Sequence, residues 1–220
     1  MANGMKIILF GEPGAGKGTL AEMLKHRQGV AHISTGDLFR REMKMSTPLG
    51  RSVVEFMNAG QLVPDPIVLD VVSELFRHSD FEKGFALDGF PRTVPQVKAF
   101  DALLREMSWQ LDGIVKIDVD ESELVKRISA RRTCKECGAV YNLQTYPPKE
   151  NGSCRKCLGE VYQREDDKED VVKTRLRVYD ELIKPVIDYY KRKGELKTID
   201  TTHLTADESY EELMRALAQK

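Results

Sequence analysis

Short apolar segments recur along the chain and are separated by longer stretches of mixed polarity. Apolar or β-branched residues dominate segments 7–10, 84–88, 113–119 and 196–199, and segment 30–34 is a fifth candidate. Runs of this length are typical of strands that are buried on both faces of a parallel sheet. The pattern therefore predicts four buried strands and a possible fifth.

Apolar residues between these segments repeat with helical spacing. The repeat covers three sets of residues: Leu20, Met23 and Leu24; Leu124, Val125 and Ile128; and Leu176, Tyr179, Leu182, Ile183, Val186 and Tyr190. In the third and longest set, Pro185 predicts a kink and Gly194 a C-terminal stop. Strands that alternate with helices predict a three-layer α/β fold, a mainly parallel sheet flanked by helices, with ligands beyond the carboxyl ends of the strands.

Residues 133–162 break this alternation. Here Cys134 and Cys137 form one C-x2-C pair, Cys154 and Cys157 form another, and 16 residues separate the pairs. This spacing is typical of a tetrahedral Zn²⁺ site with four thiolates, and such a closed site has a structural role. Fe²⁺ or Co²⁺ suits the same ligands, and a nucleic-acid-binding zinc ribbon has the same spacing. We expect a small inserted lobe held together by the metal.

Charge and composition narrow the function further. The chain has 34 Lys and Arg against 35 Asp and Glu, so its net charge is near −1. Proteins that bind polynucleotides usually carry a basic excess, so we expect no nucleic-acid partner. No apolar run reaches the roughly 18 residues that cross a bilayer, and no secretory signal is evident. We expect a cytoplasmic protein that acts as a monomer, without a membrane partner.

The first strand runs directly into a glycine-rich turn. The segment reads Gly11-Glu-Pro-Gly14-Ala15-Gly16-Lys17-Gly18-Thr19, and a helical pattern follows. Glycines let backbone N–H groups converge on an anion, the helix dipole favours negative charge, and Lys17 adds a mobile cation. The strict phosphate-binding motif has Ser or Thr after the lysine, where this chain has Gly18. The alternative is a glycine-rich turn without a ligand.

The form G-x-P-G-x-G-K-G-T resembles the phosphate loop of the nucleoside monophosphate kinases. The resemblance extends from residue 7 to about residue 203 and is closest to the long-lid adenylate kinases that carry zinc in the lid. It implies Mg²⁺-dependent transfer of a phosphoryl group from ATP to AMP, giving two ADP. By this resemblance, the ATP phosphates contact Gly14, Ala15, Gly16, Lys17, Gly18 and Thr19.

Three further segments resemble the acceptor site of that family. They are Ser34-Thr35-Gly36-Asp37-Leu38-Phe39-Arg40, Gly60-Gln61-Leu62-Val63-Pro64-Asp65, and Asp88-Gly89-Phe90-Pro91-Arg92-Thr93 with Gln96. The implied AMP contacts are Thr35, Arg40, Gln61, Leu62, Val63, Gly89, Phe90, Pro91, Arg92 and Gln96. The residue types suit these roles, since arginine pairs bidentately with phosphate and a glutamine amide matches the adenine edge. Asp88 ends a predicted strand, where a carboxylate can hold Mg²⁺ directly or through water.

Arginines and acids flank the cysteine-containing lobe. Arg127 and Arg131 precede it at a spacing that predicts one helix face, and Arg164, Asp166, Asp167 and Arg175 follow it. By the resemblance, Arg127 and Arg131 contact ATP phosphates, and Arg164 and Arg175 contact the acceptor and the transferred group. Asp166 and Asp167 orient these arginines. The adenine of ATP is expected between Val140 and Tyr141 of the lobe and the segment at His203.

The resemblance divides the chain into three parts. A core comprises residues 1–33, 64–132 and 163–220, an AMP-binding insert comprises 34–63, and a zinc lid comprises 133–162. One alternative is a UMP/CMP kinase, which Thr35 disfavours because pyrimidine-specific relatives tend to carry alanine there. The other is a zinc-ribbon binding protein, which the neutral charge and the set of Lys17, Arg92 and Arg131 disfavour.

Overall fold

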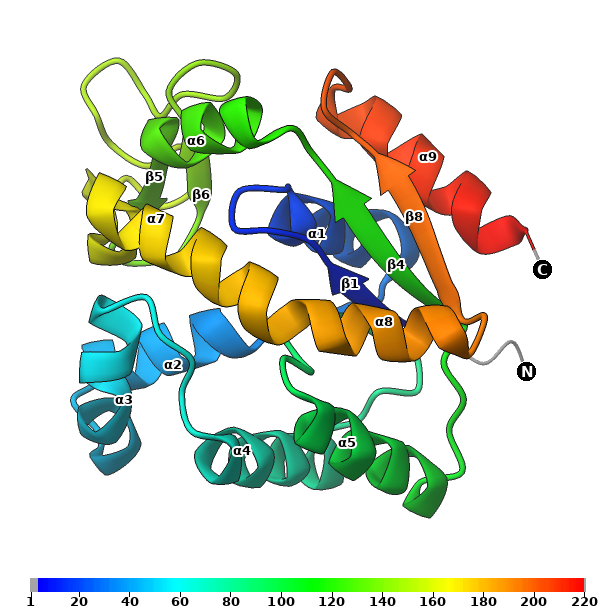
Figure 1. The fold of residues 1–220 in the computed structure, drawn as a ribbon. Helices are drawn as coiled ribbons and strands as arrows, with labels where there is room; N and C mark the ends of the chain where they lie inside the picture. Colours follow the sequence, from blue (N-terminus) through cyan, green and yellow to red (C-terminus); the bar gives the residue numbers. More distant parts are fainter. Residues whose placement is uncertain (1–3, 220) are drawn as a thin grey trace.

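The computed structural model describes residues 4–219, and a five-stranded parallel sheet lies at its centre (Figure 1). The strands, in spatial order, are β2 (Ala31–Ser34), β3 (Gly84–Asp88), β1 (Met5–Phe10), β4 (Gly113–Asp118) and β8 (Leu196–Asp200). Every neighbouring pair runs parallel. All five predicted strands, including the fifth candidate, are confirmed within one or two residues.

Side chains of β1 alternate between two cores because successive residues of a strand point to opposite faces. Ile8 and Phe10 join one core, and Ile7 and Leu9 join the other. The first core is completed by α4 (Asp65–His78), α5 (Val94–Glu106) and α8 (Lys184–Arg192), and the second by α1 (Lys17–Gln28), α6 (Glu121–Ala130) and α9 (Ala206–Ala218). The predicted three-layer α/β fold is confirmed.

Two short helices follow β2 and lie beside the sheet rather than on it. They are α2 (Thr35–Lys44) and α3 (Pro48–Asn58), and each has an N-cap side chain. Ser34 caps α2 by accepting a hydrogen bond from the backbone N–H of Asp37, and Thr47 caps α3 in the same way. These caps satisfy donors that a helix leaves free at its start. The two helices pack closely where Gly50 of α3 faces the backbone of α2.

A long helical rod crosses the molecule from the lobe to the sheet (Figure 1). It consists of α7 (Glu169–Val178), a π-helical turn at Tyr179–Ile183, and α8. Pro185 was expected to kink or break the helix. It lies instead in the first turn of α8, and the wide turn before it keeps the rod continuous. Gly194, with φ of 70°, follows the end of α8 as predicted.

The cysteine-containing lobe has its own antiparallel sheet, in the order β6 (Val140–Asn142), β5 (Arg131–Cys134) and β7 (Val161–Tyr162). This sheet begins at Arg131, two residues before the predicted start of the lid. Arg131 pairs with Asn142 in extended conformation, whereas α6 ends at Ala130. The prediction that Arg127 and Arg131 share one helix face is therefore wrong.

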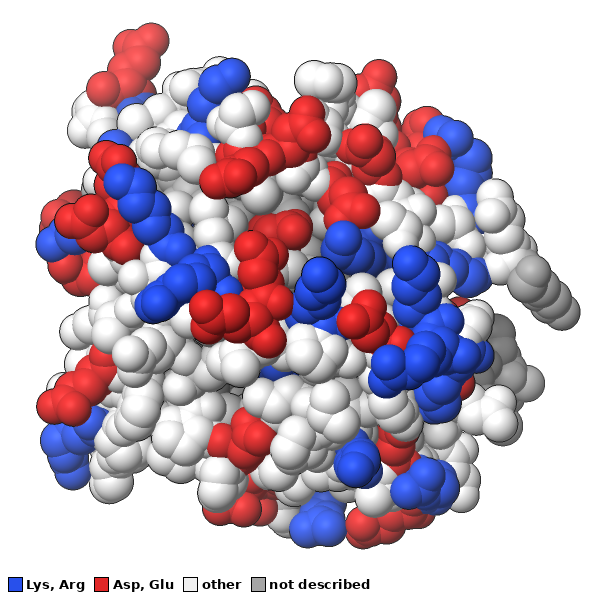
Figure 2. Space-filling model, viewed as in Figure 1, with Lys and Arg blue, Asp and Glu red and all other residues white. Residues whose placement is uncertain are grey.

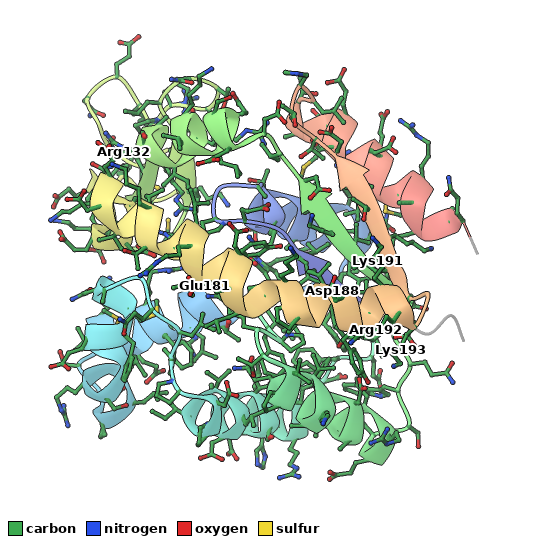
Figure 3. The ribbon with its side chains drawn as sticks, viewed as in Figure 1. Arg132, Glu181, Asp188, Lys191, Arg192 and Lys193 are labelled. Atoms are coloured by element: carbon green, nitrogen blue, oxygen red, sulfur yellow. The ribbon has the colours of Figure 1, made fainter. Side chains whose placement is uncertain are left out.

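The visible surface carries both signs of charge side by side (Figure 2). Along the rod, for example, the acidic residues Glu181 and Asp188 are followed by the basic residues Lys191, Arg192 and Lys193 near its end (Figure 3). Such mixing accompanies the near-zero net charge and forms no broad basic field on this face. Between residues 4 and 219, no helix combines the length and apolar character needed to cross a membrane.

Candidate active site

One cavity of about 2140 Å³ lies where the carboxyl ends of the strands meet the lobe and the α2–α3 insert. The glycine-rich loop, the start of α2, the segment after β3, the lobe and the β8–α9 loop all line it. All residues predicted to contact nucleotide border this cavity, and Asp88 and Asp166 border it as well. Asp167 lies behind the lining, with its side chain fully buried.

The glycine-rich loop adopts a backbone that its glycines make possible. Gly14 and Gly16 have φ of 89° and 94°, in the left-handed region that other residues avoid. A Cβ on Gly14 would also lie 2.7 Å from the side chain of Ile128. At Gly18, a Cβ would lie 3.6 Å from Oδ2 of Asp88, so the glycine leaves open space between α1 and that carboxylate. The loop is thus shaped to receive an anion beside Asp88.

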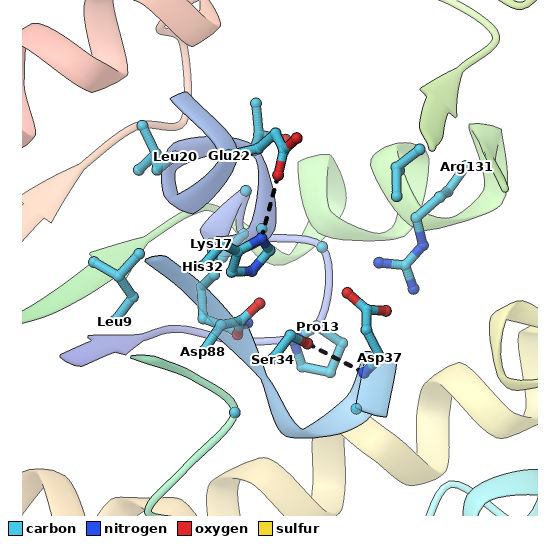
Figure 4. A pocket seen from close by; sticks show the side chains of 18 of the residues that line it. Leu9, Pro13, Lys17, Leu20, Glu22, His32, Ser34, Asp37, Asp88 and Arg131 are labelled. Atoms are coloured by element: carbon cyan, nitrogen blue, oxygen red, sulfur yellow. Dashed lines mark hydrogen bonds and ion pairs between the residues drawn. The ribbon is translucent and has the colours of Figure 1, made fainter. Parts of the chain in front are cut away.

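Lys17 folds back onto this loop. Its Nζ donates to the backbone carbonyls of Gly11 (2.8 Å) and Glu12 (2.9 Å). Burial lowers the pKa of Lys17 to about 8, although the charge of Asp88, its neighbour in Figure 4, acts in the opposite direction. An ammonium group that is desolvated in this way is stabilised by an incoming phosphate.

On the acceptor side, the carbonyl of Gly89 organises two predicted residues. It accepts hydrogen bonds from Thr35 Oγ1 (2.9 Å) and from Arg92 Nε (2.7 Å). Gly89 has φ of 83°, and a Cβ there would lie 3.0 Å from both Thr35 Oγ1 and a guanidinium nitrogen of Arg92. Only glycine therefore allows this carbonyl to hold both side chains.

Gln96 is almost completely buried, and both ends of its amide have protein partners. Its Oε1 accepts from the backbone N–H of Arg92 (2.7 Å), and its Nε2 donates to Oδ1 of Asp65 (2.7 Å). Asp65 also accepts from the hydroxyl of Thr93 (2.8 Å). Gln96 thus fixes the turn that carries Arg92, and its contact with adenine stays a prediction. Asp65 ends one of the segments that resemble the acceptor site, but no role was assigned to it from the sequence, although its place between Pro64 and Pro66 marks a helix start.

Two buried aspartates hold the arginines on both sides of the lobe. Arg131 forms a bidentate pair with Asp167, through Nε (2.8 Å) and Nη2. Arg175 pairs with Asp166 (3.1 Å) and Asp167 (3.2 Å). Asp166 also lies 3.4 Å from Arg40 of α2. The structure therefore brings together basic residues from the insert, the lobe and α7.

Asp37 is a further member of this network that sequence reasoning quoted but assigned no role. It accepts from Arg40 (2.6 Å) and lies 3.6 Å from Arg164. Burial alone would raise the pKa of Asp37, but these two arginines lower it to about 2. Arg131 points toward the same carboxylate in Figure 4. The pair of Asp37 and Arg164 joins the insert to the segment that follows the lobe.

The arginines of this network carry more positive charge than its aspartates neutralise. Burial, together with the charge of Arg131, lowers the pKa of Arg164 and of Arg175 to about 10. Buried cations that disfavour one another are stabilised by a polyanion placed between them. The electrostatics of the cavity are therefore those of a phosphate site.

On the donor side, residues predicted to contact ATP have protein partners in the structure. Arg127 donates to the backbone carbonyls of Thr201 (3.1 Å) and Thr202 (2.9 Å), so it holds the loop that leads to His203. A contact between Arg127 and phosphate stays a prediction. Of the two lobe residues expected at adenine, Val140 is half exposed, whereas Tyr141 is buried against Tyr146.

Glu22 connects α1 to the lobe and was missed at the sequence level. It lies 3.5 Å from Nδ1 of His32, as the dashed line in Figure 4 marks, and 3.7 Å from Lys156 of the lobe. Glu22 lies outside the motifs singled out from the sequence, whereas Lys156 lies inside the second C-x2-C pair.

The four cysteines converge as their spacing predicts. Their sulfur atoms all lie within 4.8 Å of one another, with Cys134 and Cys157 3.5 Å apart and Cys137 and Cys154 3.6 Å apart. Four thiolates bound tetrahedrally to Zn²⁺ at about 2.3 Å have sulfur atoms roughly 3.8 Å apart, so the set suits such an ion. Burial would raise the pKa of Cys154, but hydrogen bonds, first from Tyr141, lower it to about 6, which favours a thiolate ligand.

Fold and site together define a P-loop phosphotransferase with a separate acceptor site. The family model for adenylate kinase matches residues 9–195. The adenylate kinases of Archaeoglobus fulgidus and Carboxydothermus hydrogenoformans are 49% and 50% identical to the chain over 198 residues, covering 90% of it and 91% and 92% of those proteins. That of Thermodesulfovibrio yellowstonii is 45% identical over 216 residues, 98% of the chain and 100% of the relative.

The chain belongs to the adenylate kinase family. Enzymes of this family are nucleoside monophosphate kinases that convert ATP and AMP into two ADP, with Mg²⁺ accompanying ATP. The predicted family and reaction class are confirmed. The alternative of a zinc-ribbon binding protein with a non-functional loop is excluded by this membership.

Proposed function

We propose that the chain transfers the γ-phosphoryl group of ATP to AMP within the single large cavity, through the residues named from the sequence. The observation that carries this proposal is the convergence of Lys17, Arg92, Arg131, Arg164 and Arg175 on that cavity from separate segments. Phosphoryl transfer asks a protein mainly to position the reactants and to stabilise charge on the migrating group. A set of rigidly held cations meets both needs.

In this mechanism the glycine-rich loop holds the donor phosphates with its backbone N–H groups, and Lys17 leaves its carbonyl partners to pair with them. Asp88 lies beside the loop and would hold Mg²⁺, directly or through water; when bound, the ion would supply positive charge to the phosphates. Arg92 and Arg40 hold the acceptor phosphate. Asp166 and Asp167 keep the arginines aligned, as their ion pairs support.

We further propose that residues 34–63 act as the acceptor insert and that the lobe acts as a lid that excludes water from the transfer. Contacts between lobe and insert support a closed arrangement, since Lys44 of α2 donates to the carbonyl of Lys135 (2.7 Å) and to Glu136 (3.2 Å). Zn²⁺ on the four cysteines would give this small lobe the rigidity that its core cannot supply.

All residues of the proposed site come from one chain, which supports action as a monomer. The four free thiols suit a reducing compartment, in agreement with a cytoplasmic location. We propose that no nucleic acid or membrane takes part, since the net charge of the chain is near −1.

A coupled assay with AMP, GMP, CMP and UMP as acceptors tests the reaction. We expect rapid turnover with AMP and at least tenfold lower kcat/KM with the others, because we propose that Thr35 and Gln96 contact the adenine base. Lys17→Met is the matched negative control. Preferred turnover of UMP would overturn the proposed acceptor, and inactivity toward all four would overturn the proposed function.

A further inference from the structure

The two cysteine turns of the lobe are near copies of each other. In each, the first cysteine accepts a backbone hydrogen bond at its carbonyl, from Gly138 to Cys134 and from Leu158 to Cys154, both at 3.1 Å. The backbone N–H two residues later points at the sulfur, from Glu136 (3.4 Å) and from Lys156. The two halves of the site therefore start from the same backbone geometry.

Tyr141 breaks this symmetry. Its hydroxyl oxygen lies 3.1 Å from Cys154 Sγ and accepts a hydrogen bond from the backbone N–H of Arg155 (2.9 Å). Tyr141 and Cys154 are 2% and 0% exposed, so water does not compete for this contact. Within the described residues, the sulfur of Cys134 has no corresponding hydroxyl donor.

The direction of the contact follows from the chemistry of the ligand. A metal-bound thiolate carries no proton, so the hydroxyl of Tyr141 must be the donor and the sulfur the acceptor. Four thiolates around a divalent ion leave a net charge of −2 in a partly buried lobe. A hydrogen bond to one sulfur withdraws electron density and stabilises that charge.

Tyr141 also belongs to the strand that borders the nucleotide cavity. In β6, Tyr141 pairs with Arg132 and Asn142 pairs with Arg131, while the preceding Val140 lines the cavity. Arg131 is the arginine that Asp167 holds bidentately. Tyr141 thus connects the cysteine site with the pair of strands β5 and β6, in which Arg131 lies.

We propose that Tyr141 is a positioning residue of the metal site. Its hydroxyl group donates a hydrogen bond to the thiolate of Cys154 and so connects β6 to the second cysteine turn. This role replaces the adenine contact expected from the sequence, and it rests on the proposed metal site. The competing interpretation is that Tyr141 only fills the lobe core by stacking on Tyr146, at 5.5 Å between ring centroids.

Tyr141→Phe keeps the ring and removes only the hydroxyl, and Tyr146→Phe is the matched control on its stacking partner. We expect Zn²⁺ affinity, measured by competition with a chromophoric chelator, to fall about tenfold or more in Tyr141→Phe, as is typical when an outer hydrogen bond to a ligand is lost. Tyr146→Phe should bind Zn²⁺ like the parent. Equal affinity in all three proteins overturns the proposal.

Loading the protein with Co²⁺ in place of Zn²⁺ distinguishes the loss of a hydrogen bond to sulfur from a general loosening of the cysteine turn. We expect the thiolate-to-Co²⁺ charge-transfer band of Tyr141→Phe to move to longer wavelength, because the sulfur regains electron density. Weaker affinity with an unmoved band would overturn the donation to Cys154. A parent protein that binds no stoichiometric Zn²⁺ would instead overturn the metal site itself, so the two failures are distinguishable.

Discussion

Lys17 carries its charge at a position where burial disfavours that charge, and the same holds for Arg164 and Arg175. Each of these cations is partly neutralised by an aspartate or by backbone carbonyls, and none is fully compensated. Such residues are poised for a ligand, because a phosphate group improves the electrostatic energy of all of them together. The consequences are measurable at the level of single side chains.

Nucleotide binding should depend on pH through Lys17. The pKa of its ammonium group is about 8 in the free protein, and bound phosphates raise it. ATP therefore binds most tightly below pH 8, and its affinity falls by up to about tenfold per pH unit above that value, until the raised pKa of the complex is reached.

Titration calorimetry at pH 8, in two buffers with different ionisation enthalpies, should reveal proton uptake on ATP binding. Lys17→Met should bind more weakly and take up fewer protons. A dissociation constant that stays unchanged between pH 7 and 9.5 in the parent protein would show that Lys17 does not titrate in this range.

Asp65 supports the acceptor site without lining the cavity. Asp65→Asn replaces one acceptor oxygen by an amide donor and so disturbs the hydrogen bonds from Gln96 and Thr93, which fix the turn at Arg92. A loss of about 1 kcal/mol in the binding free energy of AMP corresponds to roughly a fivefold rise in the KM for AMP. The KM for ATP should stay constant. The exposed Asp70 on the same helix gives a control, Asp70→Asn, and equal AMP KM values for both variants would contradict this role.

At the scale of elements, the apolar runs predicted every strand of the main sheet because burial on both faces leaves no room for polar residues. The same reasoning found no strand in the lobe. There, β7 has two residues and Val140 of β6 is half exposed, so these strands depend on the cysteine site and not on an apolar pattern. The π-helical turn was equally invisible, because its residues continue the helical spacing.

More of the candidate site than of the lobe could be predicted, because the glycine-rich loop and the acceptor motifs have fixed spacing. The hydrogen-bond and ion-pair partners of the site residues could not be predicted. Asp65, Asp37 and Glu22 act through hydrogen bonds and ion pairs that only the folded chain brings together. The contact between Tyr141 and Cys154 was not found from the sequence either, because a strand position alone does not tell which face a side chain occupies.

The close approach of α2 and α3 depends on a single glycine. A Cβ at Gly50 would lie 2.1 Å from the carbonyl oxygen of Glu42, so Gly50→Ala must move one helix backbone away from the other. We expect a loss of about 1–3 kcal/mol in the free energy of unfolding, as in other overpacked sites, and a higher KM for AMP. Denaturant unfolding and steady-state kinetics measure both effects.

Ser52→Ala, on the exposed side of the same helix, is the control and should change neither quantity by much. Affinity for ATP should be preserved in Gly50→Ala, because the glycine-rich loop lies outside the insert. A variant with parental stability and parental AMP kinetics would show that the two helices separate at no cost.

At the scale of the whole molecule, the proposed metal site lies beside the only sheet besides the central one among residues 4–219, and ion pairs with Lys44 and Glu22 join the lobe to the rest of the chain. Removal of the metal should therefore loosen the lobe while the central sheet persists. A loss of about 3 kcal/mol in the free energy of unfolding would lower the melting temperature by roughly 6–12 °C for a chain of this size.

Catalysis should suffer less than stability when the metal is removed. The glycine-rich loop, Asp88 and Arg92 belong to the central sheet and its turns, so they keep their geometry, whereas Arg131 starts the strand that leads into the lobe. We expect kcat at 25 °C to fall by no more than about tenfold, or 1.4 kcal/mol. Calorimetry and a coupled assay on chelated and reloaded protein measure both effects. A melting curve that chelation leaves unchanged would contradict a structural role for the metal, because an ion bound to the folded lobe must stabilise that lobe.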